Sequence, residues 1–388
     1  MKRICHIVQS YYPRDPRIRR QAEALVEAGH WVVVYCLRGP KEPKRETVNG
    51  VHVVRLPLTR RRGSKPRYLF EYAAFFVMVS FRMLCKWGHK FDIIHVSNLP
   101  DFLVFAAFVP KLFGTKVILD EHDPMPELIM SKYDVPDTHL VIRFLKWQQR
   151  ISMRFATHVL TVNDAMKELL APNSGNRPVS VVMNLPDDRM FHPDQSKDGR
   201  DPNDGRFILL YTGTVSKTYG LSMVIEAVAS LKSRIPGLSL KIAGEGDDLP
   251  ALRKLAKDLG VADIVEFLGI VPFGQIPQLI ARSDIGVSTL KLDPLTDLCF
   301  NNKTAEYSAV GLPAIVTRTR TVEKYFPDGV VRFFEPGSME SFSEAVVELY
   351  SDQELRRRMS RKGIEFSRQS NWSAEKRKYI GLIESLTS

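Results

Sequence analysis

The sequence predicts an α/β protein with two domains, each built around a parallel β-sheet. Its 388 residues are too many for one ordinary α/β domain and enough for two. Short apolar strands alternate with amphipathic helices in both halves, a pattern typical of parallel sheets with right-handed crossovers. A polar segment rich in Asp and Gly, residues 194–205, separates the halves and is the expected linker.

The first half, residues 1–193, opens with a strand at Ile4–Gln9, a helix at Ile18–Ala28 and a strand at Trp31–Leu37. Gly29 is placed to end the helix. The same alternation continues along the chain. The further expected strands are Val51–Leu56, Ile93–Val96, Val117–Leu119, His158–Val162 and Val179–Met183, and the further helices are Tyr68–Trp87, Phe102–Phe113, Val141–Phe155 and one that begins at Asp164.

The second half, residues 206–370, restarts the same alternation. The expected strands are Phe207–Tyr211, Leu238–Ala243, Val265–Leu268, Ile285–Ser288 and Ala314–Val316, and the expected helices are Leu221–Leu231, Leu252–Leu259, Thr304–Ala309, Phe342–Tyr350, Leu355–Phe366 and Trp372–Leu386. Two such domains are expected to enclose a cleft between the carboxyl ends of their strands.

The net charge of +11 belongs entirely to the first half. Residues 1–193 carry 29 Lys and Arg against 18 Asp and Glu, whereas residues 194–388 carry 26 of each. Such a field favours a polyanion, an anionic membrane surface or an acidic substrate. The four cysteines form no Cys-x-x-Cys pair, and no signal-peptide pattern or membrane-spanning apolar window occurs, so we expect a cytoplasmic protein with reduced thiols.

The apolar helix expected at Tyr68–Leu84 has basic residues on both sides. These are Arg60, Arg61, Arg62, Lys65, Arg67, Lys86 and Lys90. Such a helix can dock on an anionic bilayer. A core helix with solvated basic flanks explains the pattern equally well, and both interpretations stay open.

Glycine-bearing loops follow the first two strands of the second half. In the first loop, Gly213 and Thr214 precede Lys217 and a helix, whose free N–H groups and positive dipole end suit a diphosphate. In the second, Gly244 and Glu245 follow a strand, and glycine permits close approach of a ligand. Plain tight turns are the alternative interpretation of both loops.

A third segment joins polar residues to a short helix. Asn301, Asn302 and Lys303 lead into the helix that carries Glu306. A carboxylate in the first turns of a helix, beside a β–α turn, can bind a ribose diol. A surface ion pair between Lys303 and Glu306, three residues apart, is the alternative.

The polar run Asp120–Glu127 follows the strand Val117–Leu119, where side chains face the cleft of a parallel sheet. His122 is the natural hydrogen-bonding or acid/base candidate. A metal site is disfavoured because no second histidine lies near in the sequence. A structural role for His122 remains an alternative.

These motifs together resemble the retaining glycosyltransferases of family 4, whose two Rossmann-like domains form the GT-B architecture, with parallel sheets facing across a cleft. The resemblance covers nearly the whole chain and depends on the order and spacing of the motifs. They are Tyr12-Pro13, Asp15–Arg17, Gly29-His30, Phe91–His95, Asp120–Glu127, Asn184–Phe191, Gly213–Gly220, Ala243–Gly246, Phe267–Gly269, Asp284–Gly286, Lys303–Tyr307, Gly311–Pro313 and the end from Trp372.

The resemblance implies a hexosyltransferase-type enzyme that moves a sugar from a nucleotide-diphosphate donor with retention, without a metal or other cofactor. It implies an acceptor-binding first domain, a donor-binding second domain and a last helix, 371–388, that crosses back to the first. The implied catalytic residues are His122, Lys217 and Glu306, and the implied donor-binding residues are Gly213, Thr214, Gly244, Glu245, Asn301, Asn302, Lys303 and Glu306. A glycan or lipid-linked acceptor in bacterial polysaccharide or cell-envelope synthesis, at the inner face of the plasma membrane, would fit.

The sequence departs from the family pattern at three places. Leu298 stands where the family has the first of two paired glutamates, and Asp297 or nearby backbone N–H groups are its candidate replacements. Thr214 and Tyr219 occupy positions where many members have arginine and lysine, which leaves Lys217. The first loop has Asp15–Arg17 in place of glycines, so its arginines are expected to face the cleft and favour an anionic acceptor.

Other function classes fit less well. A sugar-nucleotide epimerase, a phosphorylase or a degenerate sugar-nucleotide binder on the same architecture remains the alternative. Nucleic-acid binding is disfavoured because no basic stripe interleaved with aromatic residues occurs. A dinucleotide oxidoreductase is disfavoured because no Gly-x-Gly-x-x-Gly follows the first strand.

Overall fold

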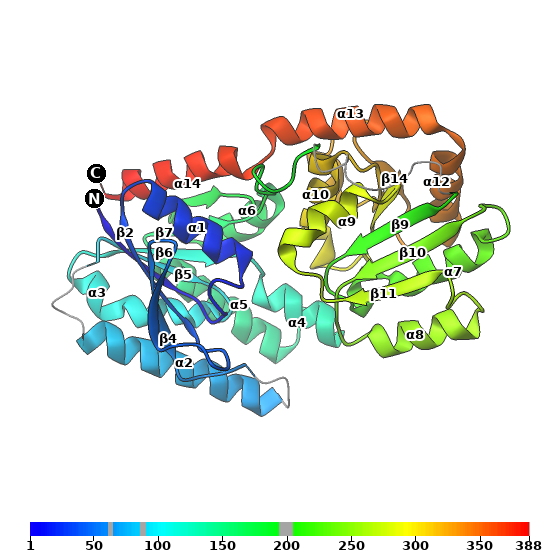
Figure 1. Cartoon of the computed structure of the whole chain (residues 1–388). Helices are drawn as coiled ribbons and strands as arrows, with labels where there is room; N and C mark the ends of the chain where they lie inside the picture. Colours follow the sequence, from blue (N-terminus) through cyan, green and yellow to red (C-terminus); the bar gives the residue numbers. More distant parts are fainter. Residues whose placement is uncertain (61–64, 86–90, 194–204, 388) are drawn as a thin grey trace. The chain divides into compact units, whose positions relative to one another are not determined.

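The computed structural model describes residues 1–60, 65–85, 91–193 and 205–387. The chain forms two compact units, each with its own sheet (Figure 1). Unit 1 comprises Met1–Asn184 and Glu375–Ser388, and unit 2 comprises Leu185–Ala374. The predicted fold class, two α/β units built on parallel sheets, is confirmed.

The sheet of unit 1 has eight described strands in the order β3-β4-β2-β1-β5-β6-β7-β8. They are β1 (Arg3–Ile7), β2 (Trp31–Leu37), β3 (Arg45–Val48), β4 (Val51–Leu56), β5 (Ile93–Ser97), β6 (Lys116–Glu121), β7 (His158–Thr161) and β8 (Val179–Val181). Every pair is parallel except β3 with β4. The sequence interpretation missed β3, whose hairpin turns at Asn49 and Gly50, both at positive φ as such tight turns require.

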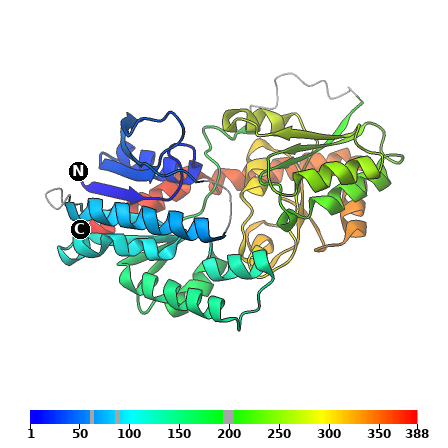
Figure 2. The same ribbon diagram turned by 90° about the horizontal axis from the view of Figure 1, so that it is seen from below.

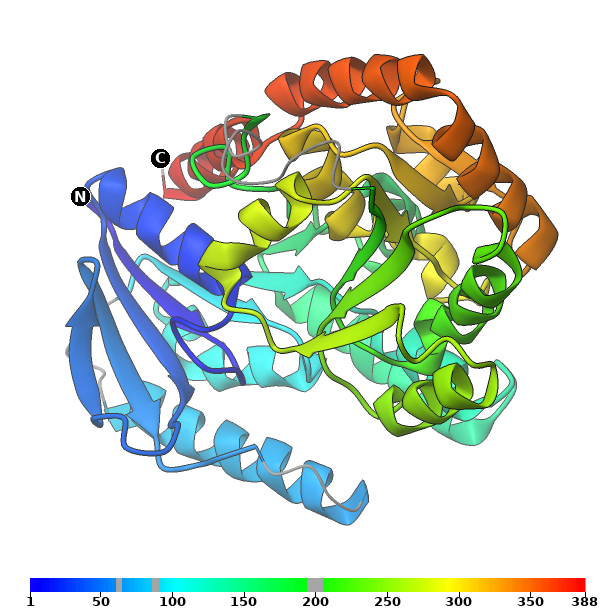
Figure 3. The same cartoon turned by 45° about the vertical axis from the view of Figure 1, so that its right-hand side comes forward.

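Helices cover both faces of this sheet. In Figures 1 and 3, α1 and α14 lie on one side and α2 on the other. The bounds are α1 (Pro16–Glu27), α2 (Lys65–Cys85), the 3-10 helix η1 (Asp101–Ala107), α3 (Phe108–Leu112), α4 (Met125–Tyr133), α5 (Leu140–Phe155), α6 (Asp164–Leu170), the 3-10 helix η2 (Ala171–Asn173) and α14 (Trp372–Thr387).

Two of these elements differ from expectation. The single helix expected at Phe102–Phe113 is instead η1 followed by α3, and Pro110, which has no N–H to donate, is tolerated in the first turn of a new α-helix. The sequence also gave no sign of α4, because Pro124 and Pro126 resemble loop residues. Pro126 lies in the first turn of α4, where proline is again compatible with a helix.

The sheet of unit 2 has six described strands, all parallel, in the order β11-β10-β9-β12-β13-β14. They are β9 (Phe207–Thr212), β10 (Leu238–Ala243), β11 (Val265–Gly269), β12 (Ile285–Ser288), β13 (Ala314–Thr317) and β14 (Arg332–Phe334). The helices are α7 (Leu221–Leu231), α8 (Leu249–Asp258), α9 (Ile276–Ala281), α10 (Asn302–Val310), α11 (Arg320–Tyr325), α12 (Met339–Ser351) and α13 (Gln353–Gln369), with 3-10 helices η4 (Lys217–Tyr219), η5 (Phe273–Gln275) and η6 (Thr296–Leu298). The short elements α9, α11 and β14 were not predicted.

The segment before the expected linker packs with unit 2. The ring of Phe191 lies 5.7 Å from that of Phe273, and the carbonyl oxygen of Pro186 accepts a hydrogen bond from the N–H of Trp372 at 2.9 Å. Unit 2 therefore begins at Leu185, whereas the sequence placed the end of the first domain at residue 193. Of the expected linker, residues 194–204 lie outside the described residues.

A buried tyrosine fixes the packing of α10 on the sheet of unit 2. The side chain of Tyr307 is fully buried, and its hydroxyl accepts from the N–H of Thr212 at 3.0 Å and donates to the carbonyl of Leu210 at 3.3 Å. A β-carbon on Gly286 would lie 2.4 Å from the Tyr307 ring. Glycine at 286 therefore permits the ring to lie flat against β12.

We expect Gly286→Ala to lower the free energy of unfolding by about 1–3 kcal/mol, because overpacking displaces the Tyr307 ring. Urea unfolding followed by circular dichroism measures this. Gly274→Ala is the matched control, since no atom lies within 4 Å of the β-carbon position at Gly274. Equal midpoints for the two variants would contradict the packing described.

Candidate active site

In unit 2, two loops at the carboxyl ends of neighbouring strands pack backbone against backbone. The N–H of Gly213 donates to the carbonyl of Ala243 at 2.9 Å, and the N–H of Val215 donates to the carbonyl of Glu245 at 3.0 Å. A β-carbon on Gly244 would lie 1.8 Å from the carbonyl oxygen of Gly213. Glycine is therefore required at 244, as close approach of two chains demands.

The helix α10 begins beside these loops with its first turn uncapped. Asn301, at φ 61°, precedes the helix but makes no side-chain cap to it. Its side-chain amide donates instead to the hydroxyl of Ser288, which also accepts from the hydroxyl of Thr304 at 2.8 Å. The first N–H groups of a helix without a cap are ready donors for an anion.

Lys303, in the first turn of α10, lies directly beneath Gly213. Its side chain is 8% exposed, and its ammonium lies 4.0 Å from the ring centroid of Tyr211 and 4.2 Å from that of Tyr219. A β-carbon on Gly213 would lie 3.4 Å from this Nζ. The surface ion pair with Glu306, the alternative from the sequence, is therefore wrong.

The ammonium of Lys303 makes no hydrogen bond in the described structure. Burial lowers the pKa of Lys303 to about 7, although the negative charges of Glu306 and Cys299 act in the opposite direction. The two tyrosine faces favour the charged form, but a buried ammonium without an acceptor is costly. An anion bound at the Gly213 loop would supply that acceptor.

The remaining predicted residues of unit 2 are less enclosed. Thr214, Lys217, Glu245 and Asn302 are exposed, and Glu306 is partly buried. Lys217 lies in η4, so the cation beneath Gly213 is not Lys217, the residue that the sequence favoured there. The cation there is Lys303 from α10, which the family resemblance had placed among the donor-binding residues without assigning it this position.

Asp297, one proposed replacement for the missing glutamate, is engaged elsewhere, and Leu298, which stands in the glutamate's place, is apolar. The Asp297 carboxylate accepts from the N–H of Arg320 at 3.2 Å and lies 3.8 Å from the guanidinium of the same residue. It therefore sits at the start of α11. Leu298 is buried at the end of η6.

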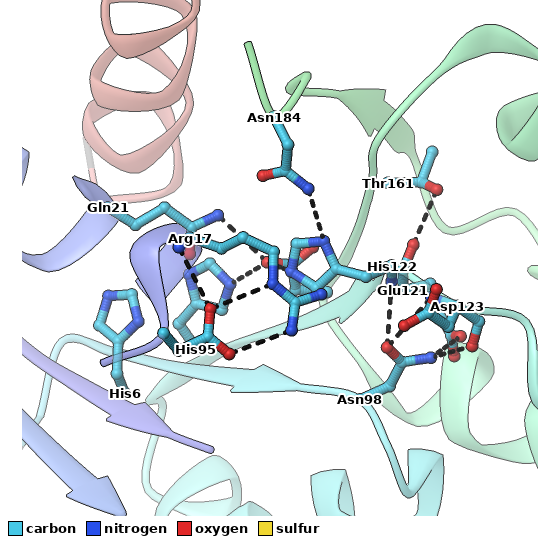
Figure 4. Close-up of polar contacts among 12 residues, drawn as sticks. His6, Arg17, Gln21, His95, Asn98, Glu121, His122, Asp123, Thr161 and Asn184 are labelled. Carbon is cyan, nitrogen blue, oxygen red and sulfur yellow. Dashed lines mark hydrogen bonds and ion pairs between the residues drawn. The ribbon is translucent and has the colours of Figure 1, made fainter. Parts of the chain in front are cut away.

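In unit 1, a buried polar cluster surrounds the carboxylate of Asp120. Figure 4 shows its members Gln21, His95 and His122 close together. Oδ2 of Asp120 lies 2.9 Å from Nε2 of His95 and 3.2 Å from the side-chain amide nitrogen of Gln21. Nε2 of His122 is also 2.9 Å away, an ion-pair distance without hydrogen-bond alignment. On the other side of the His122 ring, Nδ1 lies 3.4 Å from the amide nitrogen of Asn184.

Two further histidines adjoin this carboxylate, so His122 is not isolated as the sequence suggested. The register of β1 against β5 pairs His6 with His95, and their rings stack with centroids 4.5 Å apart. The hydroxyl of Tyr379, from α14, lies 2.9 Å from Nδ1 of His95 and 3.3 Å from Nε2 of His6. Sequence spacing could not show this grouping because β1, β5 and α14 are remote along the chain.

The charges within this cluster are set by burial and by neighbours. Burial would raise the pKa of Asp120, but the charge of the nearby His122, and then the hydrogen bond and charge of His95, outweigh it and hold that pKa well below its usual range. Burial, aided by His95, lowers the pKa of His6 well below its ordinary value. Near neutral pH, Asp120 is therefore an anion and His6 is neutral.

Asn98 holds the backbone around His122, a role that sequence reasoning missed. Its amide nitrogen donates to Glu121 and to the carbonyl of Asp123, both at 2.7 Å, while its Oδ1 accepts from the N–H of His122 at 3.0 Å. Burial, followed by the nearby carboxyls of Asp101 and Asp120, raises the pKa of Glu121 well above its ordinary value. Two adjacent carboxyl groups, Asp120 and Glu121, thus have pKa values shifted in opposite directions.

Within residues 1–60, 65–85, 91–193 and 205–387, no three or more His, Cys, Asp and Glu side chains are grouped so that they could hold a metal ion. The histidines around Asp120 are arranged as hydrogen-bonding partners.

Two family models match the chain. The family described as "Glycosyl transferases group 1" matches residues 194–366, and the "Glycosyl transferase 4-like domain" matches residues 15–185. The fold and these matches define a glycosyltransferase. The chain belongs to the group 1 glycosyltransferases, of the type that the sequence resemblance indicated, and the predicted enzyme class, a hexosyltransferase-type glycosyltransferase, is confirmed.

Known proteins resemble the chain in sequence or fold. The lipopolysaccharide core biosynthesis glycosyltransferase LpsE of Rhizobium meliloti is 31% identical over 188 residues, which are 46% of this chain and 50% of that relative. Sucrose-phosphate synthase from Thermosynechococcus elongatus has a TM-score of 0.81 and 18% identity, covering 100% of this chain and 99% of its own. The Anabaena protein HepE in complex with UDP-glucose has a TM-score of 0.74 and 15% identity, and the match covers 99% of this chain and 100% of the HepE chain. Their shared fold is GT-B.

The burial of Lys303 predicts a specific dependence of stability on pH. Its pKa is about 7 in the folded chain and 10.5 ordinarily, so between these values the unfolded chain binds an extra proton. Stability therefore rises with pH across this window, and the cost of burying the charge is fully present below about pH 7. Lys303→Met is expected to remove this rise, as urea unfolding at a series of pH values will measure. Parallel curves for the wild type and the variant would contradict the burial of the ammonium.

Proposed function

We propose that unit 2 binds a nucleoside-diphosphate sugar and that the chain transfers its sugar to an acceptor. The observation that carries this proposal is the buried, unpartnered ammonium of Lys303 beneath the Gly213 loop. The uncapped first turn of α10 adds N–H donors. HepE, which shares the fold, was solved with UDP-glucose, and this supports a donor of the same chemical class.

The leaving diphosphate is the group whose charge this site would stabilise. Negative charge builds on the diphosphate as its bond to the sugar breaks, and fixed donors in a water-poor site stabilise such charge effectively. Lys303 and the start of α10 supply the positive potential that a divalent cation supplies in many other diphosphate sites. We therefore propose a reaction without a resident metal, with Glu306 on the donor ribose and Gly213, Thr214, Gly244 and Glu245 along the loops.

We propose retention at the anomeric carbon, by attack on the face that the diphosphate leaves. The acceptor hydroxyl oxygen forms the new bond to the anomeric carbon, the bond from that carbon to the phosphate oxygen breaks, and the leaving diphosphate takes the hydroxyl proton. This course needs no enzymatic base. The resemblance assigns His122 to the transferred sugar, and the Asp120 carboxylate would orient its ring.

The proposed acceptor is a glycan or a lipid-linked glycan in bacterial polysaccharide or cell-envelope synthesis, at the inner face of the plasma membrane. LpsE, which matches part of the chain, is named for lipopolysaccharide core biosynthesis. The arginines expected to favour an anionic acceptor are partly engaged. Arg14 pairs with Glu42 at 2.8 Å and Arg17 pairs with Asp15 at 3.0 Å.

Nucleotide binding is tested by a thermal-shift screen against UDP, GDP, ADP and CMP. A nucleotide that binds only the folded chain raises the melting temperature. We expect Lys303→Met to weaken binding of the responding nucleotide roughly tenfold to a hundredfold, the value of a charge-assisted contact. Lys217→Met, a matched loss of an exposed lysine, is expected to have a smaller effect. The reverse order would assign the diphosphate to Lys217, and no response to any nucleotide would indicate that the donor site is degenerate.

Binding of the responding nucleotide should take up a proton above about pH 7. The pKa of Lys303 is about 7 without ligand, and a bound diphosphate favours its charged form. Affinity is then expected to fall as pH rises above 7, by up to tenfold per unit. Calorimetric titration in two buffers with different ionisation enthalpies measures the uptake directly, and Lys303→Met should abolish it. Equal binding enthalpies in both buffers would contradict the proposal.

A further inference from the structure

Large apolar side chains are concentrated on the outer surface of three helices in unit 1. Eleven such residues are 50–75% exposed, and we call their shared surface the three-helix face. They are Leu69, Phe70, Val77, Phe81 and Leu84 on α2, Phe108 and Leu112 on α3, and Leu140, Val141, Phe144 and Trp147 on α5. In the described part of unit 2, only Ile270 and Leu292 reach this exposure.

The helix α5 exposes aromatic side chains and buries two amides. Phe144 and Trp147 are 59% and 53% exposed, while Gln148 and Gln149 are buried against the rest of unit 1. A helix that packed only within its own domain would bury the aromatic rings and expose the amides. Ile142 and Met153 are buried as well, so α5 has apolar residues on two sides, and its exposed aromatic side is open to an apolar partner.

The helix α2 is apolar on two sides. Phe75 and Val79 are fully buried in unit 1. The exposed residues of α2 follow one another at helical spacing, so they form a single stripe along the helix. Core packing, one of the two interpretations of this helix from the sequence, therefore applies to one face of α2, and the face that docking would need is exposed. Of the basic flanks, residues 61–64 and 86–90 lie outside the described residues.

The three helices lie side by side, as Figure 2 shows. The ring of Phe108 on α3 lies 6.2 Å from that of Phe155 at the end of α5. On the other flank, Phe102 in η1 lies 5.6 Å from Phe76 of α2. The segment formed by η1 and α3 thus connects α2 to α5, and the exposed side chains belong to one layer of unit 1.

The charges on these helices select the partner. Together α2, α3 and α5 carry eight lysines and arginines and one acidic residue, Glu71. Glu71 is itself buried and pairs with Arg67 at 3.2 Å. A second copy docked about a twofold axis would set positive charge against positive charge, whereas anionic lipid headgroups complement it.

We propose that the three-helix face docks on the surface of an anionic lipid bilayer. The aromatic rings enter the boundary between headgroups and acyl chains, and the basic side chains contact the headgroup phosphates. The helices lie on the membrane, since no helix among the described residues is long and apolar enough to cross it. This proposal rests on the proposed function, because docking of the three-helix face would bring unit 1 to a lipid-linked acceptor.

Vesicle flotation tests the proposal with the full chain. Wild type is expected to float with vesicles of phosphatidylcholine and phosphatidylglycerol and to bind pure phosphatidylcholine more weakly. Phe144→Glu with Trp147→Glu should reduce binding roughly tenfold or more, because two exposed rings are lost and two negative charges added. The matched control, Ile270→Glu with Leu292→Glu in unit 2, should bind as wild type does. Circular dichroism and thermal unfolding of both variants verify that they fold.

Three outcomes would overturn the proposal: no flotation of wild type, equal loss of binding in both double variants, or a dimer in sedimentation velocity that only the α5 variant disrupts. Quenching by brominated lipid gives a second measurement. Brominated lipid should quench the tryptophan fluorescence of the wild type. The Trp147→Phe variant should show much less of this quenching. The nucleotide thermal shift of the α5 variant separates the membrane-docking proposal from the donor-site proposal. If only the donor-site proposal fails, nucleotides cause no shift but the wild type still binds vesicles.

Discussion

The arrangement of unit 1 depends on one buried carboxylate. Asp120, on β6, draws His95 from β5, Gln21 from α1 and His122 from its own strand end around a single negative charge. An unpaired charge at that depth would cost far more than any one of these contacts contributes. The positions of α1, β5 and the loop after β6 are thereby coupled, and His122 is oriented by groups that also hold the sheet together.

In unit 1, the carboxyl ends of the strands surround a buried negative charge, whereas in unit 2 they surround a buried positive one. There the buried ionisable group is the cation Lys303, and it lies between two aromatic faces without a hydrogen-bond acceptor. The buried charge of unit 1 thus has several polar partners within its own unit, whereas the buried ammonium of unit 2 has no hydrogen-bond acceptor among the described residues. This difference also offers a reason why the chain can dispense with the arginine and lysine that many members have in the loop at Thr214 and Tyr219.

The fold was largely predictable because buried parallel strands are continuous apolar runs, as at Trp31–Leu37 and Phe207–Thr212. The strand β3 escaped because it is half exposed at a sheet edge, and α4 escaped because prolines at a helix start resemble a loop. For the site, glycine positions such as Gly213 and Gly244 could be recognised locally. The grouping of His6 with His95, and the reach of Lys303, depend on strand order and side-chain direction, which spacing along the chain does not encode.

The C-terminal helix makes unit 1 discontinuous, and this has a consequence for synthesis on the ribosome. Tyr379 contacts His6 and His95, and the ammonium of Lys2 donates to the carbonyl of Thr387 at 2.8 Å, so segments that are remote along the chain meet in one unit. The residues of unit 2 are complete once Ala374 has been added, but unit 1 lacks its closing helix until residues 375–387 have been synthesised. A chain cut short by some 14 residues would therefore carry a finished second unit and an open first one.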